Sequence, residues 1–166
     1  MKLRSITITG LILSLALASL AFQCGGGSGS SGGSDSVRNA ARAADAIAGS
    51  IKEMTKVKRD LARQGSLTPA EELRLTQTLL RLNTADKALV QRLKALRGEP
   101  DASGRAELLT MFNEVSAAIN DLNSNGVLGV TNEGARNQLS TIITTLQSSM
   151  QIIQAFVQAQ GTNANL

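Results

Sequence analysis

Three oxygen-bearing side chains alternate along one short segment of the chain. Asp121, Asn123 and Asn125 are separated by single residues, and Gly126 follows them directly. Carboxylate and amide oxygens in a tight loop are the ligands that a hard cation such as Ca²⁺ takes, and glycine allows the sharp turn that gathers them. An apolar residue, Leu128, comes two positions after the glycine. The segment is therefore a candidate for a weak calcium site.

This spacing resembles the calcium loop of EF-hand and dockerin-type proteins, which is about twelve residues long. The family carries a Glu or Asp at the last loop position, whereas this chain has Asn132 there and Glu133 one residue later. Because Asp121 is the only carboxylate among the early ligands, we expect any calcium affinity to be low. The alternative is that Asn125-Gly126 simply ends a helix. We commit to no metal and expect no other non-covalent cofactor.

Few side chains in this sequence are suited to catalysis. The 166 residues include no histidine, tryptophan or tyrosine, and a single cysteine. These absences exclude Ser-His and Cys-His nucleophiles, imidazole metal sites and intramolecular disulfides. Glu107 and Glu114 share one face of an expected helix, but no histidine accompanies them. We expect no enzymatic activity and name no catalytic residue. The scarcity of aromatic side chains for base stacking also argues against nucleic-acid binding.

The C-terminal thirty residues, 137–166, contain no charged side chain. A helix exposed to water usually carries charge, whereas an uncharged face is typical of contact with another protein. This face is our preferred surface for a protein partner or for self-association. The alternative is an ordinary Gln- and Thr-rich helix that faces solvent. The residues proposed for contact are Thr141, Thr144, Thr145, Ser148 and Gln151.

Charge is divided unevenly between two halves of the chain. Residues 36–97 include 13 basic and 6 acidic side chains, whereas residues 98–166 include 2 basic and 6 acidic ones. A basic surface can hold anionic envelope material such as lipid headgroups, lipopolysaccharide or acidic glycans, since each cation near an anionic surface adds about 1 kcal/mol. In the alternative, which we favour, the cations form a solvated face and complement the acidic half within one fold.

Apolar residues recur at three- and four-residue steps in four segments, which predicts helices over about 36–64, 69–97, 103–124 and 131–160. Thr68-Pro69-Ala70-Glu71 is a capping box with proline at the first helical position, and Gly65 ends the helix before it. The positions expected to face inward are Val37, Ala40, Ala44, Ile47, Ile51, Met54, Val57 and Leu61 in the first segment; Leu75, Leu79, Leu82, Leu89, Leu93 and Leu96 in the second; Leu108, Phe112, Val115, Ile119 and Leu122 in the third; and Leu139, Ile142, Ile143, Leu146, Met150, Ile153, Phe156 and Val157 in the fourth.

Short links between these segments make consecutive helices antiparallel neighbours. We therefore expect an all-α fold, an up-down-up-down four-helix bundle over residues 36–160. The last residues, 161–166, are expected to fray. The bundle is expected to follow a flexible Gly/Ser tether at 24–35, in which every residue from 25 to 34 is Gly or Ser. Such a tether has a reach on the order of 15 to 20 Å.

The first 23 residues are typical of a secretory signal peptide. Lys2 and Arg4 precede an apolar stretch over residues 6–22, and Cys24 follows it. At 17 residues the stretch is at the lower edge of what can span a membrane, so a permanent transmembrane helix is the less favoured alternative.

The segment Leu20-Ala21-Phe22-Gln23-Cys24, with its Gly/Ser run, resembles a bacterial lipoprotein precursor. The common lipobox has Leu three residues before the cysteine and a small residue just before it, whereas this chain has Ala21 and Gln23. Leu20, four residues before the cysteine, is similar to the relaxed lipobox of spirochaete lipoproteins. The resemblance implies cleavage before Cys24, covalent lipid such as palmitate on Cys24, and anchorage in the cell envelope, with the outer membrane as the expected location. The alternative is cleavage after Ala21, which leaves Cys24 as a lone thiol.

These patterns favour a lipid-anchored cell-envelope protein whose small helical domain serves non-enzymatic binding or scaffolding. Its expected partners are the membrane, through the lipid, and another protein or a second copy of the chain. The alternative function is weak binding of calcium or of an anionic envelope polymer.

Overall fold

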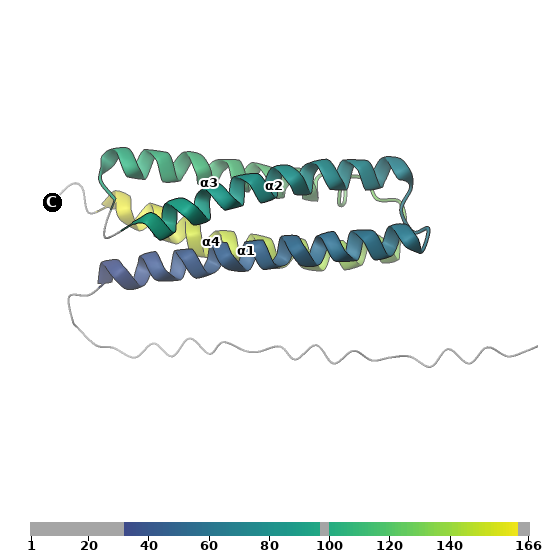
Figure 1. Ribbon diagram of the computed structural model, residues 1–166, viewed down its shortest axis with the longest axis horizontal. Coiled ribbons are helices and arrows are strands. Elements are labelled where there is room, and N and C mark those ends of the chain that lie inside the picture. Colours follow the sequence, from purple (N-terminus) through teal and green to yellow (C-terminus); the bar gives the residue numbers. More distant parts are fainter. Residues whose placement is uncertain (1–31, 97–99, 163–166) are drawn as a thin grey trace, which may run out of the picture.

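The computed structural model describes residues 32–96 and 100–162, most of which lie in four helices (Figure 1). These are α1 (Gly32–Arg63), α2 (Pro69–Ala95), α3 (Ala102–Asn123) and α4 (Glu133–Thr162). Helix α1 packs against α2 and α4, and α3 packs against the same two helices. The α1–α2 and α3–α4 connections lie at one end of the bundle (Figure 1). The expected up-down-up-down four-helix bundle is confirmed.

The apolar stripes of the four helices meet in one continuous core. Among the residues expected to face inward, Val37, Val57, Leu96, Phe112 and Val157 are partly exposed and pack against its margin, and all the others are buried. Burial of this apolar surface provides the main stabilisation of helices that would be marginal alone.

The predicted signals at the α1–α2 connection are also confirmed. The backbone N–H of Ser66 donates to the carbonyl oxygen of Leu61 at 2.9 Å, and that of Gly65 donates to Ala62 at 3.0 Å. This pair of bonds ends a helix on a left-handed residue, and Gly65 has the required positive φ of 69°. Three residues later, Thr68 caps α2.

Helix boundaries differ from the sequence expectation by up to four residues. Helix α1 begins at Gly32, inside the segment assigned to the tether, so residues 32–35 are helical. Asp35 lies in this first turn, where a carboxylate stabilises the helix N-terminus, and it pairs with Arg38 at 3.8 Å. Helix α4 begins at Glu133 because the Asn132 side chain accepts a hydrogen bond from a backbone N–H in the first turn.

Several predicted segments lie outside the described residues. They are the signal peptide, Cys24, the tether up to residue 31 and the chain end at 163–166. Helix α4 itself continues to Thr162, past the expected end at residue 160. Within the described ranges, no helix has the length and hydropathy needed to cross a membrane.

Candidate functional site

The structure places the predicted contact residues of α4 on the outer surface of the bundle. Thr141, Thr144, Thr145 and Ser148 are exposed, and each hydroxyl donates to the backbone carbonyl oxygen four residues earlier, at 3.0 to 3.4 Å. These donors are therefore satisfied within the helix. A partner that covered this face would leave no hydroxyl donor without an acceptor, so the desolvation cost of contact is low.

Gln151 and the adjacent Ile152 extend this uncharged face, and Gln151 connects it to a groove. The adjacent Ile152 has 47% of its surface exposed, although it is a large apolar residue. Gln151 itself borders a groove of about 380 Å³ between α3 and α4. Sequence analysis overlooked Ile152, although its spacing from Thr145 and Ser148 places it on the same face. We call Thr141, Thr144, Thr145, Ser148, Gln151 and Ile152 the neutral face. The groove is lined by Phe112, Ser116, Ile119, Asn120, Gln147, Met150, Gln151 and Gln154, all uncharged.

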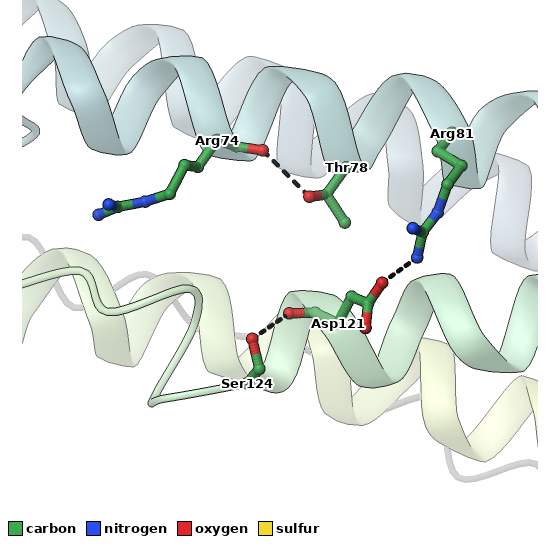
Figure 2. Close-up of polar contacts among 5 residues, drawn as sticks. All are labelled: Arg74, Thr78, Arg81, Asp121 and Ser124. Carbon is green, nitrogen blue, oxygen red and sulfur yellow. Dashed lines mark hydrogen bonds and ion pairs between the residues drawn. The ribbon is translucent and has the colours of Figure 1, made fainter.

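The candidate calcium ligands lie at the end of α3 and in the loop that follows. Asp121 lies in the last turn of α3, and its carboxylate forms an ion pair with Arg81 of α2 (Figure 2). Ser124 donates to the carbonyl oxygen of Asp121 at 2.7 Å, which closes the helix end. The described residues contain no cluster of three or more His, Cys, Asp or Glu side chains suited to a metal. Calcium would have to compete with Arg81 for the one carboxylate of the set.

The α3–α4 loop has an unusual backbone that the sequence did not predict. Five consecutive residues have positive φ: Asn125 at 49°, Gly126 at 66°, Val127 at 57°, Leu128 at 56° and Gly129 at 71°. The N–H of Leu128 donates to Ser124 at 2.7 Å and that of Gly129 to Asn125 at 3.1 Å, which makes this segment a left-handed helical turn. Such a conformation is costly for the β-branched Val127. Burial of this valine in the core offsets the cost.

Ion pairs link the basic half of the molecule to the acidic half. Arg81 pairs with Asp121, and the Arg92 Nε lies 2.7 Å from a carboxylate oxygen of Glu107. Both pairs join α2 to α3. The sequence offered Glu107 only as a carboxylate without a histidine companion, and in the structure it forms an interhelical ion pair. Glu114, which was expected to share a helix face with Glu107, borders a separate groove between α2 and α3.

Asp86 is a buried carboxylate that sequence analysis missed. It retains only 1% of its surface exposed, and neither oxygen has a hydrogen-bond partner among the described residues. Burial, with a smaller contribution from the negative charge of Asp45, raises the pKa of Asp86 to about 7; Lys94 opposes the shift. A signal was present in the sequence, because Leu82 and Leu89 surround Asp86 at the steps of the inward stripe.

Glu71 has a second role beyond the capping box. One of its carboxylate oxygens accepts from the N–H and hydroxyl of Thr68, and the other accepts from the N–H and hydroxyl of Thr131 in the α3–α4 loop. The hydrogen bond from the Thr68 N–H is the main cause that lowers the pKa of Glu71 to about 2, against the opposing effect of burial. This one buried side chain therefore links the α1–α2 connection to the α3–α4 loop through hydrogen bonds.

Comparison of the chain with protein-family models, with curated proteins and with solved structures gives no match.

Proposed function

We propose that this protein is a lipid-anchored component of the cell envelope and that its helical bundle acts by binding another protein through the neutral face of α4. The observation that carries the binding proposal is the hydroxyl pattern of that face. Thr141, Thr144, Thr145 and Ser148 have satisfied donors and no charge, and Ile152 adds exposed apolar surface among them. This combination of surface properties favours burial against a partner.

The anchor is proposed to be lipid attached at Cys24, in the outer membrane. Cys24 is the only cysteine of the chain and lies between an apolar segment and the Gly/Ser run. The N-terminal end of α1 and the C-terminal end of α4 lie at the same end of the bundle (Figure 1). The neutral face, at residues 141–152, lies midway along α4 on the side of the bundle, where a partner at the same membrane could reach it.

Site-specific photocrosslinking tests the contact surface. A photoreactive residue in place of Thr144 is expected to crosslink a defined partner, or a second copy of the chain, in native membranes. The same residue in place of Thr110 is the matched control, because Thr110 is also an exposed helical threonine whose hydroxyl donates to its own helix. Adding Ser148→Arg should abolish the crosslink from position 144, since a buried unpaired charge is costly.

A second charge insertion controls for general effects. Asn113→Arg introduces the same side chain at an exposed position of α3 and should leave the crosslink from position 144 intact. Equal crosslinking from positions 110 and 144, or loss of the crosslink with Asn113→Arg as well, would remove the neutral face as the contact surface.

A second candidate function is binding of an anionic envelope polymer to the basic half. The observation that favours it is that Lys52 and Arg59, both exposed on α1, form no ion pair within the described residues. A polymer held by charge would bind more weakly as ionic strength rises.

A further inference from the structure

A groove between α1 and α2 combines cationic and apolar side chains. Its volume is about 390 Å³, within the range of small-molecule sites. The cationic residues of its lining are Lys52, Lys58 and Arg59, and no acidic residue lines it. In the bundle, this groove lies on the opposite side from the groove between α3 and α4.

The three cations differ in how they are held. Lys58 is buried, and its Nζ donates to the Thr76 hydroxyl at 2.7 Å and lies 3.5 Å from a carboxylate oxygen of Glu72. Its position is therefore fixed by protein groups. Lys52 and Arg59 have no ion-pair partner in the described part of the chain, so their charges are available to an anion. An Arg guanidinium can hold a phosphate or carboxylate with two parallel hydrogen bonds.

The rest of the lining is suited to a short apolar chain. Ile51 and Leu79 are buried beneath the groove, and Leu80 has 65% of its surface exposed at its border. The exposed leucine next to unpaired cations offers a ligand apolar surface and a countercharge at the same place. An inorganic ion would satisfy the charges but leave the apolar surface uncovered.

We propose that this groove binds a small anionic amphiphile, with its phosphate or carboxylate head at Lys52 and Arg59 and its apolar chain on Leu79 and Leu80. The ligand can be a free amphiphile or the headgroup region of a membrane lipid, because both present the same chemistry. This proposal rests on the same two cations as the second candidate function, but its ligand is a small amphiphile and not a polymer. The groove is separate from the neutral face, so a negative result for the amphiphile site would leave the proposed protein contact untouched.

Calorimetric titration of the full chain with hexyl phosphate tests the proposal. We expect saturable binding of one molecule per chain, at least about tenfold tighter than that of inorganic phosphate because the hexyl chain covers apolar surface. The double variant Lys52→Gln/Arg59→Gln should weaken the affinity about tenfold or more. The matched control is Arg42→Gln/Arg74→Gln, which removes the same charge from exposed residues of α1 and α2 outside the groove and should change the affinity less than about twofold.

A second pair of variants tests the apolar half of the site. Leu80→Gln should weaken hexyl phosphate binding and leave inorganic phosphate binding unchanged. Leu73→Gln replaces another exposed leucine of α2 outside the groove and should have no effect. Circular dichroism of every variant verifies that the bundle is folded.

Vesicles distinguish the two ligand sources. If binding to phosphatidylglycerol vesicles is weakened by Lys52→Gln/Arg59→Gln and not by the control pair, the ligand is a membrane headgroup. If only hexyl phosphate shows that difference, the ligand is a free amphiphile. The proposal is overturned if both double variants weaken hexyl phosphate equally, if inorganic phosphate binds as tightly as hexyl phosphate, or if no binding occurs at millimolar concentrations.

Discussion

Asp86 shows how a single residue can depart from the pattern that surrounds it. Its helix has inward leucines at 75, 79, 82, 89 and 93, and an apolar residue at 86 would complete the three- and four-residue steps. The carboxylate there is buried without a hydrogen-bond partner. Such a group is costly when charged and far less costly when protonated. The stability of the bundle should therefore depend on the protonation of Asp86.

We expect the free energy of unfolding to fall as pH rises from 5 to 8. The folded-state pKa of Asp86 is raised to about 7 from an ordinary value of 3.8, so the folded protein binds the proton more tightly than the unfolded chain does. The stabilisation is fully present below about pH 4 and is lost as pH rises through 7. Between pH 5 and 8 the loss amounts to roughly 2 to 3 kcal/mol. Urea unfolding at the two pH values measures it.

Two features isolate this effect from other titrations. The chain has no histidine, and Glu71, with a pKa lowered to about 2, contributes stability that is lost only as pH falls below its ordinary value near 4.5. Asp86→Asn keeps the shape of the side chain and should abolish the difference between pH 5 and pH 8. An unchanged pH dependence in this variant would show that another group is responsible.

At the scale of the element, the helices follow from the sequence and the α3–α4 loop does not. Apolar periodicity predicts the helices and their inward faces. The capping box at Thr68 and the glycine at 65 predict where α2 begins and α1 ends. The left-handed turn over residues 125–129 depends instead on burying Val127 and Val130, which are 1% exposed. No local sequence rule predicts a valine with positive φ, because the backbone strain is offset by tertiary packing of its side chain in the core.

Two glycines with the same free space around them test the left-handed turn. A Cβ added at Gly49, inside α1, or at Gly129, in the loop, would meet no atom within 4 Å. Gly49→Ala should therefore stabilise the protein by about 0.5 to 1 kcal/mol through helix propensity. Gly129→Ala should destabilise it by about 1 to 2 kcal/mol, because its φ of 71° is unfavourable for a residue with a Cβ.

Thermal unfolding followed by circular dichroism at 222 nm compares the two variants with the parent chain. Opposite signs of the two shifts in Tm are expected. A stabilising effect of Gly129→Ala would mean that the loop does not adopt the left-handed turn.

At the scale of the whole molecule, the sequence predicted the bundle but only part of the candidate sites. The neutral face could be predicted because the absence of charged residues over thirty positions can be read directly from the sequence. The groove between α1 and α2 could not, since it needs Lys52 and Arg59 from one helix beside Leu79 and Leu80 from another. The ion pairs Arg81–Asp121 and Arg92–Glu107 likewise show which cations the fold uses internally and which it leaves available.

The neutral face and the groove between α1 and α2 lie on different parts of one small bundle, which we propose to be a binding protein held at a membrane. Lipid at Cys24 would confine it there, so that even a weak partner contact along α4 is made at high local concentration. Binding of an anionic amphiphile between α1 and α2 would not compete with that contact, because the two sites lie on different helix pairs.

The intact mass of the protein, isolated from its native membrane in detergent, tests whether lipid holds the bundle at a membrane. We expect the mass of residues 24–166 increased by covalently attached acyl chains, together with partitioning into the detergent phase. An unmodified mass matching residues 22–166, with the protein recovered in the aqueous phase, would contradict the lipid anchor. The protein would then be an exported soluble binder with a free thiol at Cys24.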